Sequence, residues 1–516
     1  MPFFGPPLDS TVPLLDILGK GIGATPDDAA LVSLRTRWTW RALDQACDRL
    51  ARNLLGLGLK PGGRVASLMP NRTELLIHYL ACMRAGLIAT PLNYRYMPPQ
   101  IDHALEVTEA SVLLAHAERR EDLAASRMVG RLPLGVISYW DRESSADRSD
   151  FEALLNEDPG DRPLPAPDPA APAIVFFTSG STGPSKGVTH THESLRWMFA
   201  SCAGAFLFTR NDVVLPGSSV SHLGGFMFSL SALSVGARVI VARSFDAPEI
   251  LPLLREERPT VLCMLPAALF GIVRDGHARR EDFSSLRMCR GGADKVPAEL
   301  EREFIALTGF PIDEGYGCSE VGLTALNPPD GEIRIGSVGR PIPGFTLSIR
   351  DDDGAEVPAD ADGRLWVQSR SIMRGYWGAD AATSEVIRDG WLDTGDMMRR
   401  DKDGYLWFRG RKKQIIVHDA SNISPQEVEE ALLDHPAVEA AGAVGIHDPV
   451  HGEDVLAYVT LRPGTEPPTG GELIEFARER IGYRAPEYIV FLETMPLNPT
   501  GKVDRVTLKR MAAKAS

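Results

Sequence analysis

Residues 64–91 alternate between a strand pattern and a helix pattern, and this alternation restricts the folds open to the chain more than any other feature. Residues 64–69 and 87–91 are short apolar runs typical of strands, and residues 71–85 between them have a helical period. The helical face consists of Leu75, Leu76, Tyr79, Leu80 and Met83, and Gly86 ends the helix. A strand–helix–strand connection pairs its strands in parallel and needs helices over the sheet. The sequence therefore predicts an α/β fold.

A length of 516 residues with 44% hydrophobic content predicts more than one domain. The proline-rich passage 158–172 suits neither a helix nor a central strand, so we expect it to separate two lobes. Short, turn-punctuated runs after residue 330 indicate a β-rich subdomain. The predicted units are a large N-terminal domain at 1–410, with lobes at about 1–165 and 173–330 and the β-rich subdomain at 331–409, a hinge at 411–413, and a small, mobile α+β C-terminal domain at 414–516.

The C-terminal part has its own set of α+β elements. Ser424, Pro425 and Glu427 form a helix-start signature, with a capping serine and proline at the first helical position. The expected elements are a helix ending at residue 433, strands at 438–446 and 455–461, and a helix at 472–481.

Charge and cysteine content exclude several classes of protein. A net charge of -14 speaks against nucleic-acid binding, which needs a basic face. The six cysteines include no Cys-x-x-Cys pair, so neither a zinc site nor a disulfide framework is expected. The N-terminus lacks a secretory signal pattern, and Pro216 and four glycines interrupt the uncharged run 213–237, so no membrane span is expected. We expect a cytoplasmic protein, and a homo-oligomer is compatible with the sequence.

The segment 178–188, Thr-Ser-Gly-Ser-Thr-Gly-Pro-Ser-Lys-Gly-Val, follows the apolar run 173–177 and has the composition of a phosphate-binding loop. Glycines let the backbone approach a ligand, while hydroxyls and a lysine suit phosphate oxygens. The residues expected to bind are Thr178, Ser179, Gly180, Ser181, Thr182, Gly183 and Lys186. The order is not that of a Walker loop, because no Gly-Lys-Ser/Thr stands at the required spacing. The alternative is an ordinary Ser/Gly surface loop.

Further motifs accompany this loop in a fixed order along nearly the whole chain. They are Pro70-Asn71, Gly86, Pro91-Leu92-Asn93, His222, Gly291-Gly292-Ala293, Tyr316-Gly317-Cys318-Ser319-Glu320, Gly336 to Pro341, Thr394-Gly395-Asp396, Gly410-Arg411 and Gly501-Lys502. Each motif alone is weak, but the ordered set is specific. With this set the chain resembles the adenylate-forming superfamily, which includes acyl-CoA synthetases, firefly luciferase and the adenylation domains of peptide synthetases.

The resemblance implies a nucleotide site made of Gly291, Gly292, Ala293, Tyr316, Gly317, Ser319, Asp396 and Arg411. Tyr316 suits stacking on the adenine, and the small residues of 291–293 leave room on its other side. Asp396 can accept hydrogen bonds from two ribose hydroxyls, with the Arg411 fork of donors beside it. Each residue alone also has an ordinary structural explanation, such as a turn or a solvated acid.

The resemblance also implies the catalytic residues, namely Lys502, Lys186, Glu320 and His222. Glu320 is the expected magnesium ligand, since its carboxylate oxygens suit a cation that bridges phosphates. Lys502 lies in a tight Pro-Thr-Gly-Lys turn and is expected to bridge the substrate carboxylate and the α-phosphate. His222 is expected to line the carboxylate channel, with a core histidine as the alternative. The small domain of similar enzymes rotates about a hinge, here Lys413.

The implied reaction joins a small-molecule carboxylic acid to coenzyme A in two steps, with ATP and Mg²⁺ as cofactors. Two alternatives stay open: an enzyme that loads a carrier-protein thiol, and a catalytically silent nucleotide-binding protein. The family commonly has a Gly-Gly pair near the thiol tunnel, but this chain has Asp419-Ala420, which either changes the acceptor or only alters a turn.

The acid itself is not specified by the sequence. The expected pocket spans His222 to Met227, Val261 to Leu265, Arg290 and Gly315 to Gly322. Arg290 stands where relatives usually carry a small residue, so it either pairs with a second anionic or polar group on the substrate or forms a surface salt bridge, which we favour. Cys318 is expected to be a buried structural cysteine.

Overall fold

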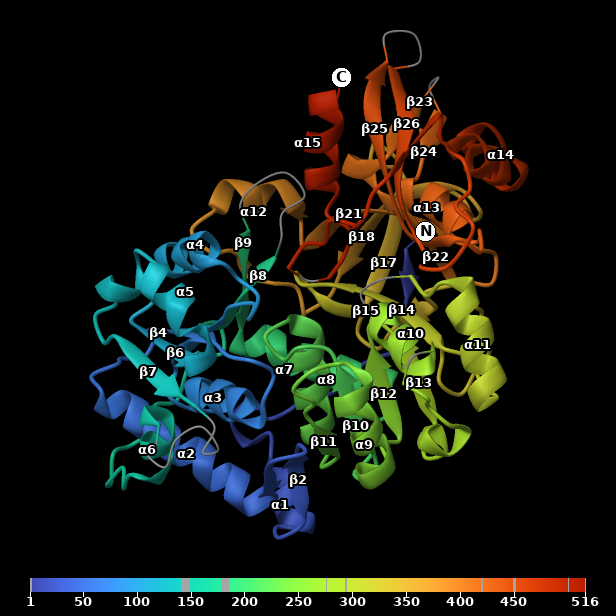
Figure 1. Cartoon of the computed structure of the whole chain (residues 1–516). Coiled ribbons are helices and arrows are strands. Elements are labelled where there is room, and N and C mark those ends of the chain that lie inside the picture. Colours follow the sequence, from blue (N-terminus) through green and yellow to red (C-terminus); the bar gives the residue numbers. More distant parts are fainter. Residues whose placement is uncertain are drawn as a thin grey trace.

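The computed structural model describes residues 2–140, 149–178, 185–274, 276–292, 295–418, 421–448, 452–499 and 501–515. Two large sheets with helices between and outside them form the large domain, a third sheet lies beside them, and a small domain with its own sheet sits above (Figure 1). This arrangement confirms the predicted α/β class with a smaller α+β domain.

The first large sheet has seven strands in the order β19-β9-β8-β5-β4-β6-β7. Their bounds are β4 (Arg64–Leu68), β5 (Ile88–Pro91), β6 (Val112–His116), β7 (Val136–Tyr139), β8 (Pro172–Thr178), β9 (Lys186–Thr191) and β19 (Gly375–Tyr376). β4 and β5 pair in parallel, as predicted. Gly86 ends the intervening helix with φ +66°, a value that glycine adopts readily.

The second large sheet has nine strands in the order β16-β15-β14-β13-β12-β10-β11-β2-β3. Their bounds are β2 (Ala29–Val32), β3 (Arg37–Thr39), β10 (Val213–Gly217), β11 (Arg238–Ile240), β12 (Val261–Met264), β13 (Met288–Gly291), β14 (Asp313–Cys318), β15 (Gly322–Leu326) and β16 (Arg340–Pro341). The strands from β2 to β14 pair in parallel, so their carboxyl ends meet at one edge. In open α/β sheets, ligands bind at that edge.

Three helices fill the space between the two large sheets (Figure 1). They are α3 (Thr73–Arg84), α7 (His192–Ala205) and α8 (Leu223–Leu233). The sequence predicted one apolar face for the first of them, but every residue of α3 is buried. A helix between two sheets meets protein on all sides, which explains the difference.

The other faces of the two sheets carry further helices. Apolar side chains of α4 (Pro98–Thr108) and α5 (Arg120–Ala125) cover the seven-stranded sheet. Those of α9 (Ala247–Glu257), α10 (Pro266–Arg274) and α11 (Ala298–Thr308) cover the nine-stranded sheet. The remaining helices of the two lobes are α1 (Gly19–Ala24), α2 (Trp40–Gly56) and α6 (Asp150–Asn156).

Strand pairing crosses the predicted lobe boundary at about 165 to 173, and the division into lobes stays a prediction. β8 and β9 follow the proline-rich passage, yet they lie in the first sheet beside β5, while β2 and β3 complete the second sheet. The passage runs along the first lobe, where the Arg162 guanidinium donates to the Arg52 carbonyl at 2.7 Å. Strand pairing over long sequence distances, which composition does not reveal, decides which sheet a strand joins.

The predicted β-rich subdomain is a six-stranded sheet whose main path is β1-β17-β18-β21-β20, with β22 paired to β21. Its strands are β1 (Phe3–Phe4), β17 (Thr346–Arg350), β18 (Asp362–Gln368), β20 (Ile387–Arg388), β21 (Trp391–Arg400) and β22 (Leu406–Arg411), and α12 (Asp380–Val386) lies beside it. The N-terminal strand β1 was not predicted. It pairs with β17 at the edge of this sheet.

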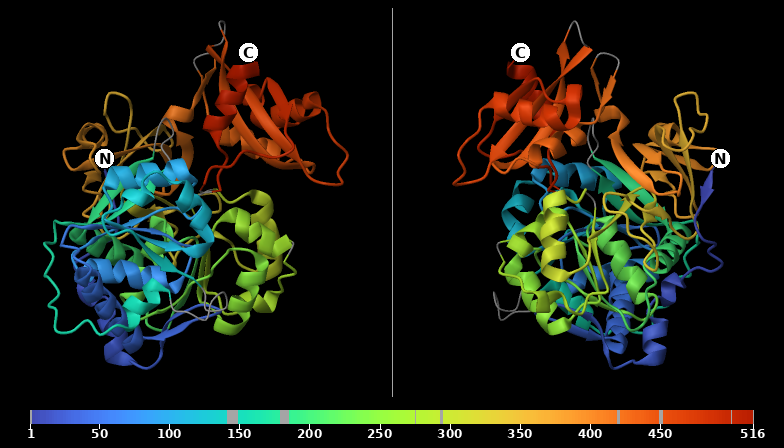
Figure 2. Two further views of the ribbon diagram at one scale, coloured as in Figure 1. Left: turned by 60° about the vertical axis from the view of Figure 1, so that its left-hand side comes forward. Right: turned by 90° about the vertical axis from the view of Figure 1, so that its right-hand side faces the viewer.

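The small domain contains the elements expected for it, placed above the large domain (Figure 2). They are β23 (Ile416–His418), β24 (Ser421–Ile423), α13 (Pro425–Leu433), β25 (Val438–Asp448), β26 (Gly452–Leu461), α14 (Gly470–Ile481), β27 (Tyr488–Phe491) and α15 (Arg505–Ala515). α13 begins at Pro425 as predicted, but the Ser424 side chain does not cap it. The exact boundary between the small domain and the large domain stays a prediction. In the part of the chain that the structure describes, no helix is long and apolar enough to cross a bilayer.

Candidate active site

A cleft of about 3520 Å³ separates the large domain from the small one. Its floor lies at the carboxyl ends of β12, β13 and β14, and the small domain contributes residues on the other side. The predicted residues that line it are Thr178, Lys186, His222, Gly292, Tyr316, Gly317, Ser319, Glu320, Asp396, Arg411 and Lys502. Residues from β8 to the C-terminal domain therefore converge on one site.

Tyr316, Asp396 and Arg411 form one hydrogen-bonded group on the cleft wall. The Tyr316 hydroxyl donates to Asp396 Oδ2 at 2.6 Å, and Arg411 Nε donates to Asp396 Oδ1 at 2.9 Å. Burial raises the pKa of Asp396, which is 2% exposed, while Arg411 and the Tyr316 hydroxyl oppose that rise. The Phe408 ring lies 6.2 Å from the Tyr316 ring at 27°, and no sequence motif predicted it. These rings and donors offer a flat, polar-edged surface suited to a nucleoside.

The two described glycines of the 291–293 motif have different surroundings. A Cβ on Gly291 would lie 2.3 Å from Val296 Cγ2, so Gly291 allows β13 to pack closely against Val296. A Cβ on Gly292 would meet nothing within 4 Å, and Gly292 lines the cleft. Of the pair, Gly292 is therefore the residue that keeps the cleft open. Ala293 lies outside the described residues.

Lys186, Glu320 and Tyr376 lie together at the end of the β8–β9 hairpin. The Tyr376 hydroxyl donates to Glu320 Oε1 at 2.9 Å, and Lys186 Nζ lies 4.7 Å from the centre of the Tyr376 ring. Sequence reasoning missed Tyr376, which reaches the site because β19 pairs with β9. Thr178 and Lys186 face each other across the hairpin, but the predicted loop residues Ser179, Gly180, Ser181, Thr182 and Gly183 lie outside the described residues.

The turn that carries Ser319 and Glu320 is fixed by buried donors. His190 Nε2 bonds the Ser319 carbonyl at 2.8 Å, and the Met373 amide donates to the Glu320 carbonyl at 2.7 Å. Burial lowers the pKa of His190 to about 4, so this histidine is neutral near pH 7. The Glu320 carboxylate is half-buried and lines the cleft, and a carboxylate in this position fits a hydrated magnesium ion.

Asn93 links His222 to the small domain. Asn93 Oδ1 accepts from the Arg95 amide at 2.9 Å and its Nδ2 donates to the Pro499 carbonyl at 3.0 Å, which fixes the orientation of the amide. The same Nδ2 lies 3.3 Å from His222 Nε2, so that ring nitrogen acts as an acceptor. Burial, with a smaller effect from Arg95, lowers the pKa of His222 to about 4. His222 is therefore a neutral acceptor.

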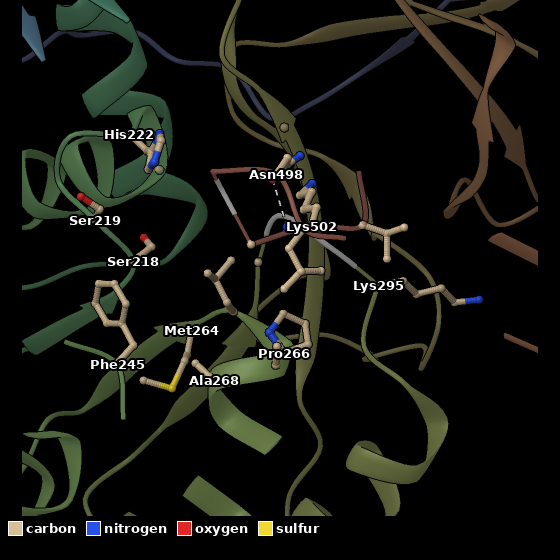
Figure 3. Close-up of a pocket in the computed structure, with 18 of the residues that line it drawn as sticks. Ser218, Ser219, His222, Phe245, Met264, Pro266, Ala268, Lys295, Asn498 and Lys502 are labelled. Atoms are coloured by element: carbon tan, nitrogen blue, oxygen red, sulfur yellow. Dashed lines mark hydrogen bonds between the residues drawn. The ribbon is translucent and has the colours of Figure 1, made fainter. Parts of the chain in front are cut away.

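Lys502 stands on a short turn that enters the cleft. The Asn498 amide donates to the Lys502 carbonyl at 2.7 Å, the Lys502 amide donates to Asn498 Oδ1 at 3.1 Å, and Gly501 has φ +87°. This is the tight turn that the sequence predicted. Figure 3 shows Lys502 and Asn498 between the wall with His222, Ser218 and Ser219 and the side with Lys295.

Two sequence expectations about the acyl pocket are wrong. Arg290 is 3% exposed and lines the cleft, so it is not in a surface salt bridge. It lies on the buried strand β13, and its guanidinium lies near Phe206, which follows α7, and Phe228 on α8. Cys318 is only half-buried and also lines the cleft, because β14 ends there. Burial, with Glu320 and Asp396 nearby, raises the pKa of Cys318, so it stays a thiol.

The two-domain α/β fold with this cleft is that of an adenylate-forming enzyme. The AMP-binding enzyme model matches residues 20–377, and the AMP-binding enzyme C-terminal domain model matches residues 427–502. The chain therefore belongs to the AMP-binding enzyme family, as the sequence predicted.

Named relatives define its kind of activity. The chain is 34% identical over 513 residues to a feruloyl-CoA synthase of an Amycolatopsis species, covering 95% of this chain and 99% of the relative. It is 31% identical over 474 residues to a sulfoacetate–CoA ligase of Cupriavidus necator, covering 91% and 92%. The enzyme is thus an AMP-forming acid–thiol ligase of the acyl-CoA synthetase kind, which uses ATP and coenzyme A.

A solved relative resembles the chain more in its ATP-bound structure than in its apo structure. Crystal structures of MatB from Rhodopseudomonas palustris are 25% identical to the chain and cover 97% of it and 99% of their own length. The TM-score is 0.88 for the ATP-bound form and 0.78 for the apo form. The present arrangement of the chain is closer to the ATP-bound form.

Proposed function

We propose that this enzyme activates a carboxylic acid as an acyl-adenylate and then transfers the acyl group to coenzyme A. The observation that carries the proposal is the seating of the Lys502 turn in the cleft. The Pro499 carbonyl within that turn accepts a hydrogen bond from Asn93, and the same cleft is lined by Tyr316, Asp396 and Arg411. A lysine at this position supports chemistry between a carboxylate and a nucleotide phosphate.

In the first step, a carboxylate oxygen of the acid attacks the α-phosphorus of ATP. The bond from that phosphorus to the bridging oxygen breaks, and pyrophosphate leaves. Lys502 would bind the carboxylate and the α-phosphate, Lys186 would face the outgoing phosphates, and Tyr316, Asp396 and Arg411 would hold the nucleoside. Glu320 would hold a magnesium ion, which supplies positive charge to the phosphates when bound.

In the second step, the thiol of coenzyme A attacks the acyl carbonyl, the bond to the phosphate oxygen breaks, and AMP leaves. His222 is a neutral hydrogen-bond acceptor and lines the channel without acting as a base. For this step we infer that the small domain rotates about Lys413, which exchanges the Lys502 turn for the hairpin at 418–421. Asp419 and Ala420 of that hairpin lie outside the described residues.

The reaction is tested with a panel of carboxylic acids, ATP, magnesium and free coenzyme A, with pyrophosphate and thioester measured in the same samples. We expect both products in equal amounts for the best acid. Pyrophosphate without thioester would favour the alternative, an enzyme that loads a carrier-protein thiol. The absence of pyrophosphate with every acid would favour a silent nucleotide-binding protein.

Lys502→Ala separates the two steps. The variant should lose adenylate formation by about a hundred- to a thousandfold, the scale of removing a transition-state donor. It should still convert a supplied acyl-adenylate and coenzyme A to thioester at a rate close to that of the unchanged enzyme. Lys402→Ala, an exposed lysine in another turn, serves as the control. Equal loss of both steps would contradict the proposed rotation.

We also propose that the enzyme works in the reducing cytoplasm. All six cysteines are free, and five of them are buried. Burial raises the pKa of the buried Cys47 and Cys202 thiols to about 12, so these groups are protonated and unreactive. Six thiols without a disulfide are typical of proteins kept under reducing conditions.

A further inference from the structure

Arg290 lies at the floor of the cleft in apolar surroundings. Its guanidinium carbon lies 5.5 Å from the centre of the Phe206 ring and 5.3 Å from that of the Phe228 ring. Gly315 makes room for it, since a Cβ at that position would lie 2.3 Å from Arg290 Nη2. Neighbouring cleft residues are apolar, namely Met227, Phe228, Cys263, Met264 and Leu323. Around Arg290, the described part of the cleft floor therefore combines apolar side chains with a cation.

No carboxylate forms an ion pair with this cation in the part of the chain that the structure describes. Among the residues that the structure describes, Arg290 makes no hydrogen bond or ion pair through its side chain, and its Nε is buried and unsatisfied. Asp313 pairs with Arg290 in register, but its Oδ1 accepts from Asn327 at 2.9 Å and its Oδ2 has no hydrogen-bond partner. The two charges favour each other, yet among the described residues no hydrogen bond or ion pair joins Asp313 to Arg290.

Arg84 shows how the same protein treats a buried arginine that is structural. Two carboxylates bind it, from Asp44 at 2.6 Å and Asp48 at 2.8 Å. A buried charge without such partners is strongly disfavoured, and two aromatic rings offset only part of that cost. Burial lowers the pKa of Arg290 and outweighs the opposing effects of Cys263 and Asp313, and an incoming anion would act in the same direction as Asp313. An arrangement this unfavourable in the free protein points to a ligand that completes it.

We propose that the acid activated by this enzyme carries a second anionic group, which the Arg290 guanidinium binds at the floor of the cleft. This inference rests on the proposed function. The reacting carboxylate lies at the Lys502 end, and the second group, a carboxylate or a sulfonate, lies at the Arg290 end. The planar fork of donors matches either oxyanion, and the apolar walls suit the carbon chain between them.

The test compares matched acids of increasing chain length. Each set contains an α,ω-dicarboxylate, the ω-sulfo analogue and the monoacid in which a methyl group replaces the second anion. Acid-dependent ATP–pyrophosphate exchange is measured for each. We expect kcat/KM for the better anionic member of the best set to exceed that of the monoacid at least tenfold. Comparing the dicarboxylate with the ω-sulfo analogue shows whether the site prefers a carboxylate or a sulfonate.

Variants of Arg290 then link the preference to this residue. Arg290→Met should reverse the preference, so that the monoacid has the higher kcat/KM. Arg290→Lys should still prefer the anionic acid, but by a smaller ratio of kcat/KM. Arg287→Met, which loses an arginine paired with Asp212 outside the cleft, should leave the preference unchanged. Melting temperatures check that each variant is folded. The wild-type comparison alone remains decisive if a variant does not fold.

The outcomes separate this inference from the proposed function. A wild-type enzyme that uses the monoacids as well as the anionic acids, or a preference that Arg290→Met leaves unmoved, would overturn the inference while the proposed function stands. An absence of exchange with every acid would overturn the proposed function itself.

Discussion

At the scale of single residues, Asp396 connects three strands in the wall proposed to hold the nucleotide. It lies on β21, and its carboxylate joins Tyr316 on β14 to Arg411 on β22. A carboxylate offers about four lone-pair positions, and these two donors use two of them. The remaining positions are available to ribose hydroxyls, so the same side chain can serve both the wall and the nucleotide.

Asp396→Asn should weaken ATP binding more than it slows chemistry. The amide keeps the shape but loses the charge that Arg411 faces, at a cost of about 1.5–3 kcal/mol. We expect KM for ATP to rise about 10- to 100-fold, with a smaller fall in kcat, in a pyrophosphate-release assay. Asp362→Asn removes an exposed partner of Arg399 and should change neither constant. An unchanged KM for ATP in Asp396→Asn would remove Asp396 from the nucleotide site.

At the scale of elements, the turn 498–502 positions Lys502 through backbone conformation. Gly501 has φ +87°, and a Cβ there would meet nothing within 4 Å. A side chain at this position therefore costs conformational energy without a clash, about 1–2 kcal/mol for a left-handed residue. The conformation of the turn, more than its packing, decides where the lysine lies.

Gly501→Ala should reduce adenylate formation about 10- to 100-fold while sparing thioester formation from a supplied acyl-adenylate. The strained turn should displace Lys502, and if Lys502 is catalytic as proposed, a small displacement has an effect of this size. Gly464→Ala is a matched control, since Gly464 also has a positive φ, +78°, and open space around it. Both variants should lose similar stability on thermal unfolding. Equal activity of the two variants would show that the turn tolerates the change.

Three buried carboxyl groups around α11 and β14 make stability depend on pH. Burial raises the pKa values of Glu301, Asp313 and Glu314 to about 7 each. A carboxyl whose folded pKa is raised contributes stability that is fully present below its unfolded pKa, near 4.5 for glutamate, and is lost as the pH rises to about 7. These three carboxyl groups should therefore stabilise the folded state more at pH 5 than at pH 8.

Glu301→Gln tests this pH dependence, because glutamine is neutral throughout. Between pH 4.5 and 7 the unfolding free energy of the unchanged enzyme should fall relative to that of the variant by about 1–3 kcal/mol. Urea unfolding at several pH values measures the difference. Glu303→Gln, on the same helix but half-exposed and paired with Arg274, is the control. Parallel pH curves for Glu301→Gln and the unchanged enzyme would contradict the raised pKa.

At the scale of the whole molecule, the sequence predicted what depends on local pattern. The unit 64–91 and the small-domain elements lie as predicted, because periodicity and short motifs fix them. The motif residues Tyr316, Asp396, Arg411 and Lys502 line one cleft. Contacts over long sequence distances could not be predicted. Tyr376 reaches Glu320 only through the β19–β9 pairing, and the sheet that β8 joins depends on its partner β5. The burial of Arg290 depends likewise on helices distant in the chain.

The small domain is held on the large one by polar contacts that can separate. Arg462 beyond β26 donates to Glu299 on α11 at 2.8 Å, and Lys295 binds Glu430 on α13 at 2.6 Å. Burial raises the pKa of Glu299, but Arg462 and Arg274 outweigh it and hold that pKa below its usual value. Partly exposed ion pairs are worth about 1 kcal/mol or less, which suits an interface that would open between the two proposed steps.

Arg462→Ala should therefore shift the enzyme away from the arrangement in which Lys502 enters the cleft. The loss of about 0.5–1 kcal/mol predicts a two- to fivefold slower adenylation rate in single-turnover experiments. Thioester formation from a supplied acyl-adenylate should be unchanged or faster, because the opposite arrangement becomes more populated. Arg478→Ala removes an ion pair with Glu475 inside α14 and should affect neither step. Adenylation as fast as in the unchanged enzyme, with thioester formation slowed, would mean that the Arg462–Glu299 contact belongs to the second step.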